Sequence, residues 1–236
     1  MLQVKEVSKK FEKPDGTSLQ VLTNISLSLR DGEILGVFGS KGSGRSTLLR
    51  ILSGVLSPDS GFVCVDGERI DRLSAGDRRR MIGRVASDSH TDLPSDSTVE
   101  GILSEALAIG SPSAAVPAAL EHMMQELEVY ARRLADFVSA SRSKSIGTLT
   151  VGERQLIAIL RTILARPNLL VLDGHVEPLD TAQRKDADLC MAYAALTGQI
   201  VIVAKSDDFS WVGSTCTTGT RLLEGKNHNF VISASM

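Results

Sequence analysis

A short apolar segment that runs directly into a glycine-rich turn constrains the fold of this chain more than any other feature. Residues 34–38 (ILGVF) form a continuous apolar run of the kind that is buried in a parallel sheet, and residues 39–46 (GSKGSGRS) follow without a gap. Residues 46–53 then carry leucines at helical spacing. A strand, a glycine-rich loop and a helix in this order are the context that a phosphate-binding loop requires. The chain is therefore expected to be an α/β protein.

The glycine-rich loop has the spacing of a P-loop, G-x-x-x-x-G-K-S/T, with Arg45 in the position of the lysine. Backbone N–H groups at the glycines can turn inward around phosphate oxygens, and the N-terminus of the following helix adds a positive partial charge. Ser46 is positioned to ligate Mg²⁺. An ordinary glycine/serine turn is the alternative, and the apolar strand before the loop argues against it. The residues predicted to contact the nucleotide phosphates are Gly39, Ser40, Lys41, Gly42, Ser43, Gly44, Arg45, Ser46 and Thr47.

Arg45 changes what this loop is expected to do. Arginine keeps the positive charge, but its wide planar fork cannot sit between the terminal phosphates as a compact ammonium does. Nucleotide binding is expected to survive this change, whereas phosphoryl transfer is expected to suffer. Lys41 could partly replace the missing lysine charge, and its direction cannot be read from the sequence.

Composition excludes several other classes of protein. Apolar residues make up 42% and charged residues 23% of the 236 residues, as in an ordinary globular protein. An aromatic content of 4% and a net charge of −2 argue against a nucleic-acid-binding surface. The three cysteines lack any paired spacing, which favours a reducing cytosol over a disulfide framework or a zinc site. No run of 18 apolar residues occurs, so the chain is not expected to cross a membrane.

Two further patterns predict how the rest of the chain is organised. Apolar residues alternate in Leu2–Val7 and Val21–Leu29, which predicts antiparallel strands at an edge. The segment from Thr98 to about Ser145 changes to helical periodicity, and we expect an inserted helical lobe with a break at 110–113 and one long helix over 118–137.

The sheet is expected to resume after this helical segment. We predict two buried strands, Leu169–Leu172 and Ile200–Ala204. The helical stretch Asp180–Ala195 separates them. A strand, a helix and a strand in this order are typical of a βαβ unit in a parallel sheet.

A second set of motifs follows the helical segment. Residues 149–155 (LTVGERQ) lead into a helical stretch that ends near Arg166, and residues 169–173 (LLVLD) follow. Their order and their spacing from the P-loop resemble the ATP-binding cassette (ABC) ATPases, the nucleotide-binding subunits of ABC transporters, over nearly the whole chain. The resemblance implies a P-loop NTPase fold of ABC type, with a mixed sheet core, an antiparallel β edge and an inserted α-helical lobe. It also implies one domain over 1–236, with the core in 1–97 and 151–236 and the helical lobe in 98–150.

The resemblance implies roles for individual residues. Leu149–Glu153 is similar to the family signature LSGGQ, and Leu169–Asp173 is similar to the Walker B strand, whose terminal aspartate supports Mg²⁺ through water. Phe11 falls where the family places an aromatic residue that stacks on adenine. The implied cofactors are ATP and Mg²⁺, and the implied metal residues are Ser46 and Asp173.

Four positions depart from the family pattern. Gly174 stands where the family carries the glutamate that polarises the attacking water, and Arg45 replaces the P-loop lysine. Ser87 takes the place of the Q-loop glutamine and Ser206 that of the switch histidine. A missing base typically costs about 10²–10⁴-fold in rate, although losses within one site do not add. We therefore expect no catalytic residue at these positions, and weak or no ATP hydrolysis at this chain's own site.

The signature motif is better preserved than the catalytic groups. Thr150 keeps a hydroxyl, Gly152 keeps a close backbone approach, and Glu153 is a common variant of the terminal glutamine, while Val151 replaces a glycine. ABC cassettes dimerise head to tail, so that the signature of one chain acts in trans on the ATP held by the other. The resemblance thus predicts a heterodimer with a second, competent ABC ATPase subunit, bound to integral-membrane transporter subunits on the cytoplasmic face of a membrane. No nucleic acid is expected among the partners.

Two other functions remain open at this point. The chain could be a pseudo-ATPase that holds Mg·ATP and acts as a structural or regulatory module, or an active homodimeric ABC ATPase, which Gly174 and Ser206 disfavour. Glu177 follows closely after Gly174 and is a possible substitute base. The resemblance places it in the segment that the family calls the D-loop, closed here by Leu179 and Asp180, and we expect this position to direct it toward the dimer interface. Contacts with membrane subunits are expected around 87–96 and in the helices of 99–140.

Overall fold

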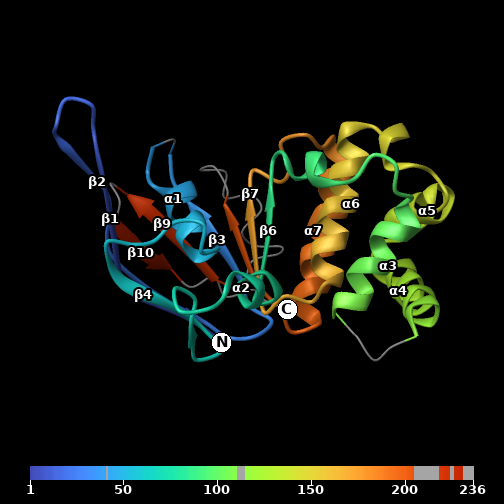
Figure 1. Ribbon diagram of the computed structural model, residues 1–236, viewed down its shortest axis with the longest axis horizontal. Coiled ribbons are helices and arrows are strands. Elements are labelled where there is room, and N and C mark those ends of the chain that lie inside the picture. Colours follow the sequence, from blue (N-terminus) through green and yellow to red (C-terminus); the bar gives the residue numbers. More distant parts are fainter. Residues whose placement is uncertain (41, 111–114, 205–217, 224–225, 231–236) are drawn as a thin grey trace. The chain divides into compact units, whose positions relative to one another are not determined.

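The computed structural model describes residues 1–40, 42–110, 115–204, 218–223 and 226–230, and the backbone contacts divide the chain into two compact units (Figure 1). The first unit contains Met1–Arg84, Asn168–Asp173 and Gly198–Met236. The second contains Val85–Pro167 and Gly174–Thr197. The helical segment expected over 98–150 lies within the second unit, and its assignment as a separate lobe stays a prediction.

An antiparallel sheet of order β2-β1-β4-β5 forms one part of the first unit. Its strands are β1 (Leu2–Glu12), β2 (Ser18–Leu29), β4 (Ser60–Val65) and β5 (Glu68–Arg69). The hairpin of β1 and β2 closes where the Lys13 amide donates to the Thr17 carbonyl at 2.8 Å, and it extends as a long ribbon in Figure 1. The predicted antiparallel edge is therefore confirmed.

A second sheet of order β10-β9-β3-β8-β7-β6 carries the P-loop. Its strands are β3 (Ile34–Phe38), β6 (Ile82–Ala86), β7 (Leu169–Asp173), β8 (Ile200–Ala204), β9 (Thr218–Leu223) and β10 (Lys226–Phe230). Strand β3 runs parallel to both β8 and β9, and all five of its residues are buried. A strand covered on both faces reads as a continuous apolar run, which is why residues 34–38 do not alternate.

Two helices belong to the described part of the first unit. Helix α1 (Arg45–Leu52) follows the loop after β3 and buries one apolar face, in contact with β7 and β8. The buried residues of this face are Leu48, Leu49, Ile51 and Leu52. Helix α2 (Ala75–Met81) begins where the Ser74 hydroxyl accepts a hydrogen bond from the Asp77 amide at 3.1 Å. A single apolar core joins α1 to strands of both sheets, so the P-loop is attached to a rigid support.

The second unit is helical in its described residues. Its elements are the short 3₁₀ turns η1 (Ser89–Asp92) and η2 (Ile146–Thr148) and the helices α3 (Val99–Gly110), α4 (Val116–Tyr130), α5 (Arg132–Ser141), α6 (Val151–Leu164) and α7 (Thr181–Leu196). Helix α6 is central, because it contacts α3, α7 and η1 and is buried along most of its length (Figure 1). Among the helices of the described residues, none has both the length and the apolar character that a membrane span needs.

One helix prediction is wrong. The single long helix expected over 118–137 is two helices, because α4 ends at Tyr130 and α5 begins at Arg132. Ala131 between them has φ −145° and ψ 58°, and it is almost fully buried. The break allows α5 to turn its own apolar face inward. Apolar spacing on either side of a buried alanine continues smoothly, so periodicity alone does not reveal this turn.

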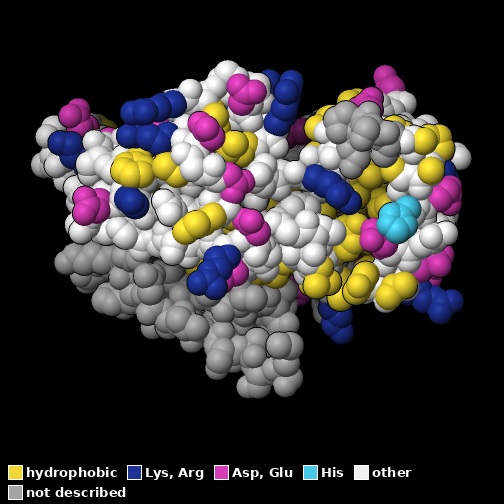
Figure 2. Space-filling view, turned by 90° about the horizontal axis from the view of Figure 1, so that it is seen from below, with side chains coloured by type: hydrophobic (Ala, Val, Ile, Leu, Met, Phe, Trp, Pro, Cys, Tyr) yellow, Lys and Arg dark blue, Asp and Glu magenta, His cyan; other side chains and the backbone are white. Residues whose placement is uncertain are grey.

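Charged side chains of both signs are interspersed on one face of the protein. On the described part of the face in Figure 2, lysines and arginines are interspersed with aspartates and glutamates rather than gathered by sign. This distribution agrees with the net charge of −2. Such a surface gives little electrostatic attraction to a polyanion.

Candidate functional site

The phosphate loop of the first unit is held by short backbone contacts. The Ser43 amide donates to the Ser40 carbonyl at 3.1 Å, and the Leu48 amide donates to the Gly44 carbonyl at 2.8 Å. The Ser43 hydroxyl is buried and has no hydrogen-bond partner within the described residues. Buried hydroxyls are nearly always satisfied, so this one indicates a place for an acceptor or donor from a ligand. Lys41 lies outside the described residues.

Gly44 carries the sharpest backbone requirement in this loop. It caps α1 with a φ of 95°, in the left-handed region. A β-carbon at this position would lie 2.9 Å from the Val21 carbonyl oxygen and 2.9 Å from a methyl carbon of Leu22. Only glycine therefore allows the chain to turn here and to present the N-terminus of α1 to the loop.

The two residues predicted to support the metal lie together. Ser46, in the first turn of α1, donates its hydroxyl to a carboxylate oxygen of Asp173 at 3.3 Å, although 127 positions separate them in sequence. A hydroxyl and a carboxylate offer the hard oxygen ligands that Mg²⁺ prefers. The described residues contain no cluster of three or more His, Cys, Asp or Glu that could hold a metal by itself. This pair therefore fits an ion that takes its remaining ligands from water and phosphate.

Phe11 lies near the end of β1 with 38% of its surface exposed, so its ring is accessible for stacking. The ammonium of Lys9 stands 5.7 Å from the ring centroid. The same ammonium donates to the Asp59 carboxylate at 2.7 Å, and the Lys10 amide donates to that carboxylate at 2.7 Å. Asp59 thus fixes the strand on which Phe11 is carried, and the adenine contact of Phe11 stays a prediction.

Asp59→Asn should remove a pH-dependent part of the stability. The hydrogen bond from the Lys9 ammonium, followed by the one from the Lys10 amide, lowers the pKa of Asp59 below its usual 3.8. A lowered pKa in the folded state stabilises above the unfolded value, and this contribution is lost as the pH falls through the folded value. In thermal melts from pH 7 down to pH 2, the wild-type advantage over D59N should shrink below about pH 4. The same substitution at the exposed Asp136 is the matched control, and an equal pH profile for both variants would refute the assignment.

The signature motif forms the exposed beginning of α6 in the second unit. Thr150 is the N-cap residue, and its hydroxyl accepts from the Glu153 amide at 3.3 Å. The Glu153 carboxylate in turn accepts from the Thr150 amide and from its hydroxyl, both at 2.8 Å. This reciprocal capping box satisfies the first turn of the helix and fixes where the Thr150 hydroxyl lies.

The two other signature positions differ in exposure. The side chain of Val151 is 44% exposed and occupies no space within the unit, so the replacement of a glycine is tolerated there. Gly152 is buried, and a β-carbon on it would lie 2.3 Å from the amide oxygen of Gln183. Gln183 belongs to the first turn of α7 and forms a capping box with Asp180. Gly152 therefore allows the beginnings of α6 and α7 to pack closely.

Two of the four departures from the family pattern are neighbours in the second unit. Gly174 has a φ of 70°, and a β-carbon built on it would lie 3.4 Å from the β-carbon of Ser87. Neither residue carries a long polar side chain into the space they share. Arg45 lies in the first unit, half-buried at the start of α1, and Ser206 is outside the described residues.

Gln155 is a buried polar residue to which the motif comparison assigned no role. It is fully buried in α6, and its amide nitrogen donates to the carbonyls of Ala86 at 2.7 Å and His175 at 3.1 Å. Its amide oxygen accepts from the His90 amide at 3.1 Å. One side chain thus ties the signature helix to the segment after β6 and to the loop after β7. A polar residue on the apolar face of α6 was the signal available in the sequence.

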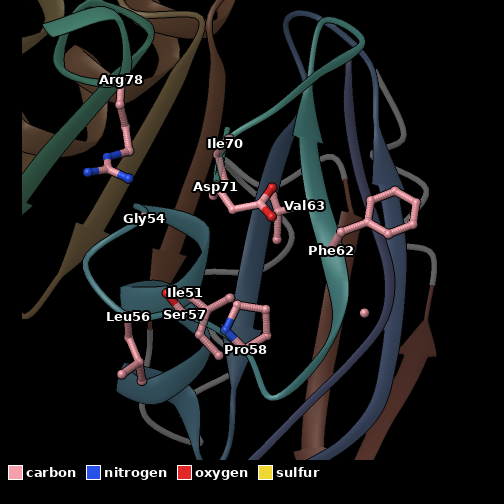
Figure 3. Close-up of a pocket in the computed structure, with 11 residues that line it drawn as sticks. Ile51, Gly54, Leu56, Ser57, Pro58, Phe62, Val63, Ile70, Asp71 and Arg78 are labelled. Carbon is pink, nitrogen blue, oxygen red and sulfur yellow. The ribbon is translucent and has the colours of Figure 1, made fainter. Parts of the chain in front are cut away.

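A separate pocket in the first unit does not fit a nucleotide. Figure 3 shows it between the end of α1, strand β4 and the side chain of Arg78. Its volume is about 30 Å³, comparable to the space of a single water molecule. Its lining residues are Ile51, Gly54, Leu56, Ser57, Pro58, Gly61, Phe62, Val63, Ile70, Asp71 and Arg78.

Several curated proteins are similar in sequence. The chain is 33% identical over 184 residues to the "Tyrosine transport ATP-binding protein" of Clostridioides difficile, which covers 76% of the chain and 71% of that protein. It is 28% identical over 217 residues to the "Methionine import ATP-binding protein MetN" of Burkholderia thailandensis, covering 86% and 59%. It is 27% identical over 235 residues to the "Lipoprotein-releasing system ATP-binding protein LolD" of Neorickettsia sennetsu, covering 98% and 97%. The chain spans between 42% and 61% of the length of the MetN proteins that it matches.

Solved structures share the fold. A structure described as the ATP-binding subunit of an ABC transporter superposes with a TM-score of 0.76 at 19% identity, over 98% of this chain and 90% of that one. A dimeric ATP-binding cassette bound to ADP and Pi superposes with a TM-score of 0.75 at 20% identity, over 98% and 99%. The ABC-type fold expected from the motifs is thus confirmed.

The family model described as "ABC transporter" matches residues 22–178, which include the P-loop, the signature and the strand ending at Asp173. The matched segment spans well over half of the chain, and the curated relatives that it resembles are ATP-binding proteins of transport systems. The chain therefore belongs to the ABC transporter family, as a member of its ATP-binding cassettes.

Proposed function

We propose that this chain is a nucleotide-binding subunit of an ABC transporter, or of a related membrane complex, whose own ATP site is catalytically impaired. Its signature completes the ATP site of a second, competent ABC ATPase in a head-to-tail heterodimer. The chain works on the cytoplasmic face of a membrane, attached to integral-membrane subunits. The substrate class is set by those subunits.

Binding of Mg·ATP is supported by the first unit. Gly44 fixes the turn into α1, the Ser43 hydroxyl is buried without a partner in the described residues, and Ser46 contacts Asp173 at 3.3 Å. Backbone N–H groups of the loop would hold the phosphates, and the Ser46 and Asp173 oxygens would hold Mg²⁺. The ion, when bound, would neutralise charge on the terminal phosphates.

The impairment rests on one observation, the backbone at Gly174. Phosphoryl transfer to water needs a group that orients or deprotonates the water, and the position after Asp173 has no side chain. Its φ of 70° disfavours any other residue, because a left-handed conformation costs about 1–2 kcal/mol for a residue with a β-carbon. The local backbone is thus fitted to glycine, and a simple Gly174→Glu change meets this strain.

A role of the signature in trans is supported by the geometry of α6. The Thr150 hydroxyl is exposed at the N-terminus of this helix, where backbone N–H groups and the helix dipole attract anions. Val151 points to solvent and Gly152 gives no steric hindrance. This end of the helix is therefore available to the terminal phosphate of an ATP that another chain holds.

The experiment compares ATP hydrolysis by the purified chain with hydrolysis by the complex that a tagged chain carries through purification. The chain alone should bind Mg·ATP and hydrolyse it weakly or not at all, and the partner ATPase should restore turnover. Thr150→Trp should abolish the restored activity, because it fills the space in front of α6. Gly152→Leu should abolish it as well, because its side chain collides with Gln183 and displaces the beginning of α6. Ser143→Trp, an exposed loop change, is the matched control.

Three outcomes would overturn the proposal. Restored activity that survives both signature substitutions would refute the role in trans. Robust turnover by the isolated chain would instead favour an active homodimer. Binding of a labelled ATP analogue without turnover in any complex would favour a pseudo-ATPase with a structural or regulatory role.

A further inference from the structure

The beginnings of α6 and α7 in the second unit meet at a single amide group. Gly152 is buried in the first turn of α6, and a β-carbon on it would lie 2.3 Å from the amide oxygen of Gln183. The same β-carbon would lie 2.9 Å from the amide carbon and 3.0 Å from the amide nitrogen of that side chain. All three atoms of the amide group therefore lie against Gly152, and they join the signature to the first turn of α7.

The Gln183 amide group is fixed by the cap of α7. Its oxygen accepts a hydrogen bond from the Asp180 amide at 3.1 Å, and the Gln183 backbone amide donates to the Asp180 carboxylate at 2.8 Å. The Ala182 amide donates to the same carboxylate oxygen at 2.9 Å. One side chain thus completes the capping box of α7 and supports the first turn of α6 at the same time.

Two consecutive turns hold the backbone that leads into this cap. The Glu177 amide donates to the Gly174 carbonyl at 3.0 Å, and the Leu179 amide donates to the Val176 carbonyl at 3.1 Å. The Glu177 carboxylate contacts Gly174, since a β-carbon there would lie 3.1 Å from its nearer oxygen. A displacement of this segment would move the cap of α7, and the first turn of α6 would have to follow.

The two capping boxes differ in charge. Both Glu and Gln can serve at the third helical position of such a box, and α6 uses Glu153 whereas α7 uses Gln183. The Glu153 carboxylate is bound by the Thr150 amide and hydroxyl. A carboxylate in the place of the Gln183 amide would add negative charge beside Gly152, at a helix end whose N–H groups and dipole attract anions. The neutral amide keeps this helix end available to a phosphate.

We propose that Gln183 is a positioning residue of the signature. Its neutral amide holds the first turn of α6 in the place where it meets a phosphate of the ATP that a partner chain holds. It also links this turn to residues 174–180, so that contacts made by that segment reach the signature within one unit. The inference rests on the function proposed above and adds to it a residue outside the signature motif. Gln183 transfers no proton, so its effects fall on nucleotide affinity and on the order of the first turn.

The first test uses the chain alone and asks whether Gly152 and Gln183 are coupled. Gly152→Ala should lower the melting temperature by about 4–8 °C, because its β-carbon collides with the fixed amide. In a Gln183→Ala background this collision is removed, and the same change should lower the melting temperature by no more than about 2 °C. Ser74→Ala, which removes a capping hydrogen bond from α2 in the first unit, is the matched background and should leave the full effect of Gly152→Ala.

Hydrogen exchange in the same variants shows where the effect lies. The Thr150 hydroxyl accepts from the Glu153 amide, and the Thr150 carbonyl accepts from the Arg154 amide. In Gln183→Ala these two amides should exchange about tenfold faster, because the first turn of α6 has lost its support. In Ser74→Ala both should exchange at the wild-type rate.

The second test uses the complex with the partner ATPase. Gln183→Glu keeps the capping box, so the melting temperature should not fall, but its charge repels an incoming phosphate. The KM for ATP should rise about three- to tenfold with kcat nearly unchanged, and the rise should shrink at high salt. A residue that only stabilised the fold would not shift KM at a constant melting temperature. Gln125→Glu, at an exposed position of α4, is the matched control and should leave KM unchanged.

The outcomes separate this inference from the proposed function. If the complex gains no turnover, or if Thr150→Trp leaves the gained turnover intact, the proposed function fails and the role of Gln183 in trans fails with it. If Thr150→Trp abolishes turnover but Gln183→Glu leaves KM unchanged, only the inference is overturned. An equal effect of Gly152→Ala in the wild-type and Gln183→Ala backgrounds also overturns it, because the two residues would then act independently.

Discussion

Gly44→Ala is expected to lower the affinity for Mg·ATP about 100-fold, a loss of about 2.7 kcal/mol. The left-handed φ of 95° at this residue is unfavourable for alanine, and the new β-carbon would meet the Val21 carbonyl oxygen at 2.9 Å. A backbone oxygen cannot swing aside as a side chain does, so the first turn of α1 must shift. The N–H groups that hold the phosphates would shift with it. Equilibrium binding of a labelled ATP analogue measures the effect.

A matched substitution separates backbone strain from this collision. Gly16, in the β1–β2 turn, has a φ of 78°, and a β-carbon on it would meet nothing within 4 Å. Gly16→Ala should therefore cost some stability through its φ and leave the ATP affinity unchanged. Wild-type affinity in Gly44→Ala would show that the loop does not bind phosphate through the geometry described.

Gln155→Leu is expected to destabilise the protein by about 2–5 kcal/mol. Leucine fills a similar volume, but it leaves the Ala86 and His175 carbonyls and the His90 amide without their partner. Each unsatisfied buried group costs about 1–3 kcal/mol, and these costs do not add fully. For a chain of this size the melting temperature should fall by roughly 5–15 °C, as followed by calorimetry or circular dichroism.

The control for this loss is the same substitution on a surface. Gln125 is exposed on α4, and Gln125→Leu should change the stability by no more than about 0.5 kcal/mol. Equal melting temperatures for both variants would mean that Gln155 does not hold the three segments together. A fall in Gln155→Leu alone would identify Gln155 as the residue that positions the signature helix relative to the loop after β7.

The elements nearest the P-loop were predictable because their signals are local. The continuous apolar run of β3, the leucines of α1 and the alternation in β1 and β2 follow from which faces each element buries, and the structure confirms all three. The helix break at Ala131 was not predictable. It depends on how α5 packs within its unit, and a buried alanine carries no sign of it in the sequence.

The residues of the candidate site also divide into those that the sequence identified and those that it did not identify. The loop glycines, Ser46 and Asp173 were identified from spacing, and the structure brings Ser46 and Asp173 to 3.3 Å. Gln155 had no such signal beyond a polar residue on an apolar helix face. Its role depends on three backbone groups that lie 20 to 69 positions away in the chain.

The sequence by itself determined the family of this protein, the place of its phosphate loop and the absence of a side chain at position 174, since each of these is a matter of which residue stands at which spacing. Only the tertiary structure decided what fills the space beside Gly174. Two consecutive turns and the anchor from Gln155 hold the backbone that carries Glu177, and the contact of its carboxylate with Gly174 has no period that a sequence can display.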